Sequence, residues 1–153
     1  MSQIGLSEFA DRLNEIMPVV SREFFSKQVS DMFKDKITIS QLFVLDFLYK
    51  QGQSRMSDLA HFMRVTTAAM TGIVDRLVRS GYVRRIFEPQ DRRIIKAELT
   101  ARGAELTRKI TEHKKDMIIK VFGRISQDER TEYLKILTHI QEALAEEKDT
   151  PAP

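Results

Sequence analysis

The sequence predicts a mainly α fold (α+β) with one small β-hairpin. Apolar residues recur at gaps of three and four along most of the chain, which is the period of a helix. Between residues 82 and 99 the pattern changes to short runs rich in β-branched and aromatic residues. With 153 residues, 42% of them hydrophobic and 31% charged, the chain has the composition of one globular domain.

A long helix is expected at the start of the chain. Residues 6–24 carry apolar side chains at helical spacing, and Ser7 is a candidate N-cap. Pro18 lies inside this pattern and lacks a backbone N–H. It should therefore kink the helix or split it into two pieces.

Three shorter helices should follow. The capping-box pattern at residues 38–41 opens the first of them, and Gly52 ends it. A second should start at Ser57 and run through Met63. After a tight turn, Thr66 should cap the third, which ends at Gly81.

A β-hairpin and two long helices should complete the chain. The two strands are expected at residues 82–87 and 95–99, joined by a turn at 88–91. Thr100 should cap a helix that runs to about Gly123. The capping box Ser126-Gln127-Asp128-Glu129 should open the last helix.

Positive charge is concentrated in the middle of the chain. The formal net charge is +3 overall, but residues 54–103 hold ten basic and five acidic residues. Nine of those ten bases are arginine, whose planar fork suits phosphate groups and guanine edges. Such a segment is either a solvated basic surface or a surface that binds phosphate.

Two short helices separated by a tight turn and followed at once by a basic hairpin make a winged helix-turn-helix. The second helix can enter a major groove, and the hairpin can reach an adjoining minor groove. Thr67, Ala68 and Thr71 lie opposite the apolar stripe of that helix, and their side chains suit thymine methyls and base edges. The alternative is that they are ordinary solvent-facing positions.

The hairpin carries the sequence Asp91-Arg92-Arg93 near its turn. A carboxylate at Asp91 can hold Arg93 in an extended rotamer, which reduces the entropy lost when the guanidinium enters a narrow minor groove. The alternative is a surface ion pair that only stabilises the turn.

Taken in order and spacing, these segments resemble the signature of the MarR (multiple antibiotic resistance regulator) family. The resemblance implies a homodimeric transcription regulator, usually a repressor, that binds a pseudo-palindromic operator in double-stranded DNA. It also implies release by a small aromatic or phenolic ligand. The matching segments are Ile37-Thr38-Ile39-Ser40-Gln41, Val44-Leu45, Ser57-Asp58-Leu59-Ala60, Thr66 to Leu77, Ser80-Gly81-Tyr82-Val83-Arg84-Arg85, Asp91-Arg92-Arg93 and Leu99-Thr100-Ala101-Arg102-Gly103.

Site residues follow from the resemblance position by position. Arg93 matches the wing arginine, Asp91 its orienting acid, and Arg85 the arginine at the start of the wing. Ser57 falls at a helix start, where backbone N–H groups can meet phosphate. The residues expected to bind DNA are Ser57, Thr66, Thr67, Ala68, Thr71, Arg76, Arg85, Asp91, Arg92 and Arg93.

The resemblance and the apolar patterns together suggest how the chain is divided. Residues 37–103 should form the winged helix-turn-helix domain, flanked by dimerisation helices at 1–36 and 104–148, with a flexible tail at 149–153. Two apolar stripes exceed what the DNA-binding core needs and should meet a partner chain. The alternative is a monomer whose last helices pack on their own core. The stripes are Leu6, Leu13 and Val20, and Tyr133, Leu137, Ile140 and Leu144.

A ligand pocket is expected between the dimerisation and DNA-binding parts. Its candidate lining is aromatic and apolar, with Arg22 or Lys27 available for an anionic group. The alternative is that these side chains simply fill the core. The candidate residues are Phe24, Phe25, Phe43, Phe47 and Met117.

Several function classes are disfavoured. The absence of cysteine removes thiolate catalysis and zinc-thiolate sites, and the resemblance therefore does not extend to redox-sensing relatives. His61, His113 and His139 lack metal-ligand spacing, so no metal, cofactor or enzyme activity is expected. No apolar run is long enough to span a membrane, and we expect a cytoplasmic protein. A winged protein-interaction module without an operator remains the alternative function.

Overall fold

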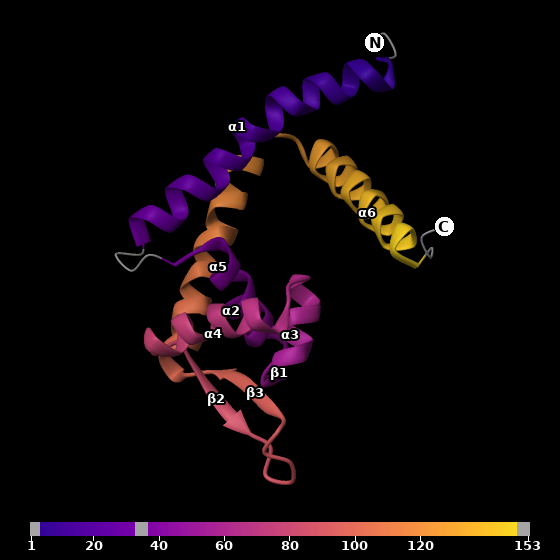
Figure 1. Ribbon diagram of the computed structural model, residues 1–153. Helices are drawn as coiled ribbons and strands as arrows, with labels where there is room; N and C mark the ends of the chain where they lie inside the picture. Colours follow the sequence, from indigo (N-terminus) through magenta and orange to yellow (C-terminus); the bar gives the residue numbers. More distant parts are fainter. Residues whose placement is uncertain (1–3, 33–36, 150–153) are drawn as a thin grey trace. The chain divides into compact units, whose positions relative to one another are not determined.

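A computed structural model describes the backbone of residues 4–32 and 37–149, with side chains at 4–23 and 37–146. The chain divides into two compact units, Met1–His113 and Lys114–Pro153. No helix in the described ranges is long and apolar enough to cross a membrane. The elements, in order, are α1 (Leu6–Met32), α2 (Ile39–Gln51), β1 (Ser54–Arg55), α3 (Met56–Met63), α4 (Thr67–Arg79), β2 (Val83–Phe87), β3 (Ile95–Leu99), α5 (Ala101–Phe122) and α6 (Gln127–Asp149) (Figure 1).

The mainly α fold with a small sheet is the one that the sequence predicts. Helices α2, α3 and α4 and the sheet share one hydrophobic core, which holds α4 and the wing strands together. Its largest fully buried side chains are Leu45, Leu48, Leu59, Met70, Leu77, Val44, Val74 and Val83.

The sheet has three antiparallel strands in the order β1-β3-β2. Strands β2 and β3 form the predicted hairpin, with Val83 opposite Leu99 and Phe87 opposite Ile95. The short strand β1, which pairs Ser54 with Ala97, was missed. A strand of two residues is too short to show an alternation of apolar and polar side chains, so the sequence does not predict it. It forms through its pairing with β3.

Most helix ends follow the predicted caps. Thr38 forms a capping box with Gln41, and the hydroxyl of Thr66 accepts a hydrogen bond from the backbone N–H of Ala69 at 3.1 Å. The start of α3 differs from the prediction. Its N-cap is Arg55, which makes no side-chain capping bond, so Ser57 lies inside the first turn.

Helix α1 is continuous across Pro18. It changes direction near its middle (Figure 1), the part of the helix that contains Pro18. The predicted kink is therefore confirmed and the predicted split is wrong. Because the helix already includes Leu6, Ser7 lies within it and is not its N-cap.

A close backbone contact joins the end of α4, the start of β2 and the first turn of α5. The Thr100 hydroxyl donates to the Gly81 carbonyl at 2.7 Å and accepts from the Gly103 N–H at 3.0 Å. A Cβ added at Gly103 would lie 1.9 Å from the Tyr82 carbonyl oxygen. Only a glycine therefore allows this approach. We call this contact the Tyr82–Gly103 joint.

Arg102 adds to the same joint. One guanidinium nitrogen donates to the Ser80 carbonyl at 3.2 Å, and the guanidinium carbon lies 4.8 Å from the centre of the Tyr82 ring. Ser80 is the C-cap of α4. A cation at the carbonyl end of a helix is favourable, so Arg102 fixes the end of α4 to α5.

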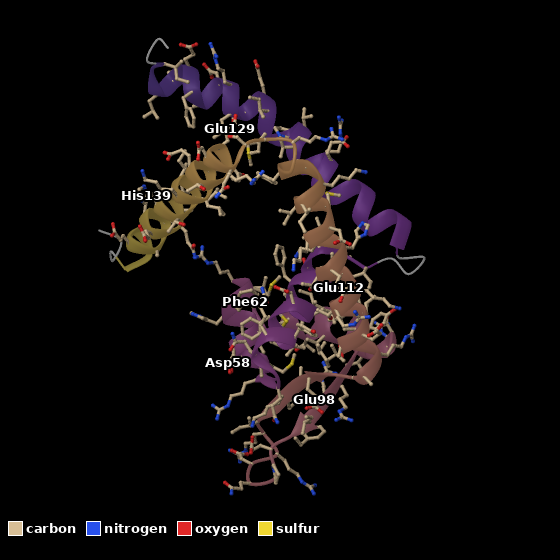
Figure 2. The ribbon with its side chains drawn as sticks, turned by 180° about the vertical axis from the view of Figure 1, so that it is seen from behind. Asp58, Phe62, Glu98, Glu112, Glu129 and His139 are labelled. Atoms are coloured by element: carbon tan, nitrogen blue, oxygen red, sulfur yellow. The ribbon has the colours of Figure 1, made fainter. Side chains whose placement is uncertain are left out.

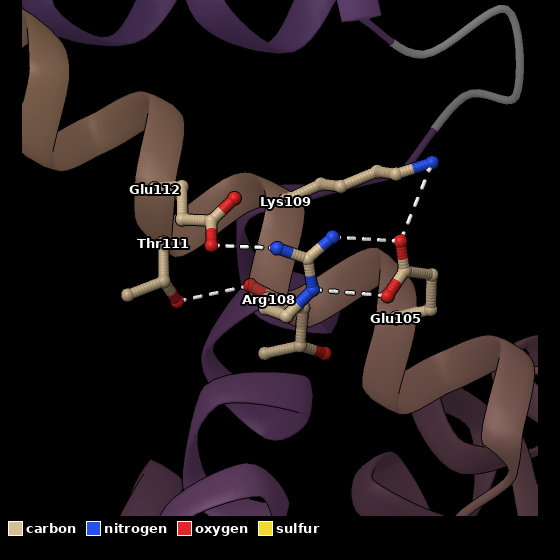
Figure 3. A network of polar contacts seen from close by, with 6 residues as sticks. Glu105, Arg108, Lys109, Thr111 and Glu112 are labelled. Atoms are coloured by element: carbon tan, nitrogen blue, oxygen red, sulfur yellow. Dashed lines mark hydrogen bonds and ion pairs between the residues drawn. The ribbon is translucent and has the colours of Figure 1, made fainter.

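A second polar group lies further along α5 (Figure 3). Arg108 donates two hydrogen bonds to the Glu105 carboxylate, at 2.9 and 3.0 Å, and one to Glu112 at 2.6 Å. The hydrogen bonds from Arg108, more than the charge of Lys109, lower the pKa of Glu105 from 4.5 to about 2. All of the side chains are exposed, so the group supports the helix locally.

In the second unit, the loop between α5 and α6 is fixed by a capping box. Ser126 N–H donates to the Glu129 carboxylate at 2.7 Å, and Glu129 N–H donates to the Ser126 hydroxyl at 3.2 Å. The first of these bonds lowers the pKa of Glu129. The rings of Phe122 and Tyr133 lie 5.3 Å apart across the same loop. The predicted capping box is confirmed.

We expect Gly103→Ala to destabilise the protein by about 1–3 kcal/mol or more, because the added methyl must displace the Tyr82 carbonyl. Gly72→Ala is the matched control. Gly72 lies inside a helix, and a Cβ added there would have nothing within 4 Å, so this variant should gain about 0.4–1 kcal/mol of stability. Denaturant unfolding of both variants measures the difference, and equal effects would contradict the close contact.

The carboxyl of Glu105 should titrate near pH 2 in a carbon-detected NMR titration, and Arg108→Ala should return it toward 4.5. Since the folded-state pKa is depressed, the stabilising contribution is complete above pH 4.5 and fades as the pH falls toward 2. Thermal unfolding of the wild type and of Arg108→Ala across that range checks the sign. A normal Glu105 midpoint in the wild type would exclude the contact.

Candidate nucleic-acid interface

Helix α4 presents two distinct faces. Met70, Val74 and Leu77 are buried in the core, whereas Thr67, Ala68 and Thr71 are exposed as predicted. The Thr71 hydroxyl donates to the Thr67 carbonyl at 2.9 Å. Its proton is therefore engaged within the helix, which leaves its lone pairs and its methyl group for a ligand.

Two further predicted residues lie at helix starts. Thr66 is exposed and caps α4 with its hydroxyl oxygen, so its hydroxyl proton is still available for a phosphate oxygen. Ser57 is exposed in the first turn of α3, beside an N-cap that makes no side-chain bond. N–H groups in such a turn are suited to bind an anion.

The wing loop connects β2 and β3. Its backbone is closed by Glu88 N–H to Ile94 O at 3.1 Å and by Ile94 N–H to Asp91 O at 3.0 Å. The Asp91 carboxylate accepts a hydrogen bond from the backbone N–H of Arg93 at 3.0 Å. It forms no ion pair with the Arg93 guanidinium. The prediction that Asp91 orients the Arg93 side chain directly is therefore wrong, because the carboxylate orders the backbone instead.

Three ion pairs surround this loop and the base of the wing. Arg84 pairs with Glu98 across the strands, and Lys96 pairs with Glu88. Arg85 on β2 pairs with Asp75 on α4, with 2.6 Å between Arg85 Nη1 and Asp75 Oδ1. This last pair connects the wing with α4, which corresponds to the recognition helix of a helix-turn-helix. The three pairs neutralise three of the five acidic side chains between residues 54 and 103.

Five arginines in the same part of the chain have exposed side chains that remain unpaired. None of their guanidinium groups forms an ion pair or hydrogen bond with a residue that the structure describes. They lie before α3, in the turn after α3, on α4 and at the tip of the wing, where side chains ending in nitrogen surround the loop (Figure 2). They are Arg55, Arg64, Arg76, Arg92 and Arg93.

Sequence reasoning found three of these arginines and missed Arg55 and Arg64. Arg64 is the C-cap of α3 and has a left-handed backbone with φ of 52°. This conformation costs a non-glycine residue about 1–3 kcal/mol, so glycine or asparagine would suit the turn better. The signal available in the sequence was an arginine in the tight turn before Thr66, at a position where glycine or asparagine would be usual.

The predicted ligand-lining residues are not all described. Phe43 is 49% exposed, and Phe47 packs against Phe62 with ring centres 4.4 Å apart. Met117 is partly buried on α5, in the second unit. The side chains of Phe24, Phe25 and Lys27 lie outside the described residues, and Arg22 is exposed on α1. Phe62 was missed, because its contact with Phe47 joins two different helices and leaves no local pattern in the sequence.

Comparison with known proteins identifies the family. The MarR family model matches residues 37–95, which span α2 to the start of β3. Residues 37–95 therefore belong to the MarR family. A Bacillus subtilis protein named HTH-type transcriptional repressor MdtR is 28% identical over 145 residues, covering 92% of this chain and 91% of MdtR. The family consists of transcriptional regulators and not of enzymes, in agreement with the sequence-based expectation.

Solved structures agree with this assignment. Streptococcus pneumoniae FabT, solved in complex with DNA, is 26% identical with a TM-score of 0.79, covering 90% of this chain and 98% of FabT. RV1404 from Mycobacterium tuberculosis is 27% identical with a TM-score of 0.77, covering 94% of this chain and 97% of RV1404. The predicted winged helix-turn-helix is confirmed, and the chain is similar over most of its length to transcriptional regulators of the MarR family.

Proposed function

We propose that the protein is a homodimeric transcription repressor that binds a pseudo-palindromic operator in double-stranded DNA and is released by a small aromatic or phenolic ligand. The observation that supports DNA binding is which charged side chains form ion pairs and which do not. Three acidic side chains around the wing are paired, while Arg55, Arg64, Arg76, Arg92 and Arg93 are exposed and have no partner among the described residues. Free guanidinium groups beside neutralised acids are what phosphate binding requires.

Contacts with DNA divide into two kinds under this proposal. The unpaired arginines, Ser57 and Thr66 hold phosphates, and Arg93 enters a groove from a loop that Asp91 orders. Base edges are read from α4. Thr67 and Ala68 offer methyl groups and one hydroxyl, and Thr71 offers lone pairs that suit the amino group of adenine or cytosine.

The names of the relatives support this proposal. FabT was solved in complex with DNA, and MdtR is named a transcriptional repressor. A repressor acts by occupying its operator, which needs no catalytic group on the protein. Occupation of an operator by the proposed dimer is therefore a sufficient mechanism, with no chemical step.

Dimerisation is supported by apolar surface that stays exposed in the single chain. On α6, Tyr133, Leu137, Ile140 and Leu144 are 44%, 42%, 49% and 54% exposed, and they share one face of the helix. Leu6, Leu13 and Val20 on α1 are also exposed. Stripes of this kind on a globular protein usually meet a partner. The proposed partner is a second copy, which would present two recognition helices to an inverted repeat.

Ligand release rests on aromatic side chains that remain accessible. Phe43 is 49% exposed on α2, and the rings of Phe47 and Phe62 form a tilted pair in the same unit. An aromatic acid can stack on such rings, and Arg22 is a candidate partner for its carboxylate. Release requires the ligand to prefer the form that does not bind DNA.

We expect Arg93→Ala to weaken binding to operator and random duplexes alike and to reduce the slope of log affinity against log salt by about one unit. Arg124→Ala removes the same charge outside the winged unit, residues 37–103, and should leave the slope unchanged. Fluorescence anisotropy at several salt concentrations measures both. Thr71→Ala should instead lower the ratio of operator to random affinity.

A salt slope near zero for the wild type would favour the alternative of a winged protein-interaction module, since a mainly apolar protein interface releases few counterions. An unchanged slope in Arg93→Ala alone would show that the wing tip does not contact DNA. Equal losses on operator and random DNA for Thr71→Ala would remove that residue from base reading.

Leu137→Glu should shift the protein from dimer to monomer, because it places a carboxylate in the apolar stripe of α6. Thr138→Glu adds the same charge on the neighbouring face of the helix and should leave the dimer intact. Light scattering at micromolar concentration measures both masses. A monomeric wild type would end the dimer proposal, and with it the expectation of a two-fold footprint.

Salicylate-like aromatic acids should bind the free protein at up to millimolar concentration and weaken its operator complex. A tenfold loss of operator affinity needs about 1.4 kcal/mol of preference for the released form. Phe43→Ala should reduce ligand binding, whereas Tyr49→Ala, which removes another half-exposed ring from α2, should not. Binding that leaves operator affinity unchanged would contradict release by this ligand class.

A further inference from the structure

The ion pair between Asp75 and Arg85 lies on the face of α4 that is proposed to contact DNA. Asp75 is the only acidic residue of α4, whose residues are all described. It follows Thr67 and Thr71 at intervals of four, which puts all three on one face of the helix. The carboxylate therefore belongs to the face that would read DNA.

An uncovered carboxylate on that face would oppose binding. DNA phosphates repel it, and the acceptor groups on base edges give it no partner except an exposed amino group. Within the described ranges, the cation that covers Asp75 is the Arg85 guanidinium at 2.6 Å. Arg79 lies nearby, but its Nε donates to the Asp75 backbone carbonyl at 3.4 Å and not to the carboxylate.

Arg85 differs from the unpaired arginines around it. Its side chain is 27% exposed, less than the 42% of Asp75, and its neighbour Arg84 pairs with Glu98. Since a pair this exposed contributes little to folding stability, stability alone does not account for its position between the wing and α4. A guanidinium that covers Asp75 is also unavailable to a phosphate.

We propose that Arg85 is a positioning residue that contacts Asp75 and not DNA, and that it acts on operator binding by neutralising that carboxylate and holding the wing strand against α4. This inference rests on the proposed function and changes the role that sequence resemblance gives Arg85. The effect of Arg85 on affinity passes through Asp75, so the two residues form one unit.

A double-variant cycle tests the proposal. Arg85→Gln should weaken operator binding by roughly three- to tenfold, because it uncovers Asp75. Asp75→Asn removes the carboxylate, and the double variant, which has the wild-type net charge, should regain near wild-type affinity. Its salt slope should also equal that of the wild type, because no phosphate contact has been lost.

A direct contact between Arg85 and DNA gives the opposite pattern. The double variant would then bind as weakly as Arg85→Gln, with a slope lower by about one unit, and this outcome overturns the inference. Arg84→Gln with Glu98→Gln is the matched control, since it removes a neighbouring pair that does not touch α4 and should change affinity little.

Two further readouts keep the test independent of folding and of the proposed function. Circular dichroism should show the same fold for all variants, and Arg85→Lys, which keeps the charge, should bind better than Arg85→Gln. Wild-type binding with a clear salt slope upholds the proposed function whatever the cycle shows. Failure of the wild type to bind any duplex would instead remove both.

Discussion

The geometry of the winged unit depends on the close approach of two backbones at the Tyr82–Gly103 joint. There the end of α4, the start of β2 and the first turn of α5 meet within hydrogen-bond distance, because position 103 carries no Cβ. Thr100 bridges the two sides with one hydroxyl, and Arg102 lies over Tyr82. Since the joint is made of backbone and short side chains, it leaves little freedom of rotation. The recognition helix, the wing and the first turns of α5 are thereby positioned as one body.

Ion pairs determine which basic side chains of the winged unit are available to a partner. The sequence places ten basic residues between 54 and 103, but their number says little about which of them bind a partner. In the structure, acidic side chains select Arg84, Arg85 and Lys96 for pairs within the protein. The arginines left over lie mostly at turns and at the wing tip, where the local chain has few acids to offer. Much of the positive charge of the segment is thus carried by five arginines that form no ion pair with the described residues, namely Arg55, Arg64, Arg76, Arg92 and Arg93.

Local signals were enough to predict most of this fold. Side-chain caps at Thr38, Thr66 and Ser126 are hydrogen bonds within four residues, so the sequence contains both partners. Features that depend on distant residues were not readable. Strand β1 exists through its pairing with β3, and the Asp75–Arg85 pair joins residues ten positions apart on different elements. The same reason explains why the unpaired arginines could not be separated from the paired ones before the fold was known.

The small side chains on the exposed face of α4 limit how well one copy of the protein could distinguish DNA sequences. Thr67, Ala68 and Thr71 offer methyl groups and few free hydrogen-bonding atoms, because the Thr71 hydroxyl proton already serves the Thr67 carbonyl. Each good base contact discriminates by about 1–3 kcal/mol, so three weak readers distinguish few sequences. In the proposed dimer the same contacts are made twice, and the discrimination energies add over the two half-sites. Under the same proposal, arginines at the wing tip would add a readout of groove width without requiring specific bases. The apolar stripes of α1 and α6 would then be as necessary for specificity as the recognition helix itself.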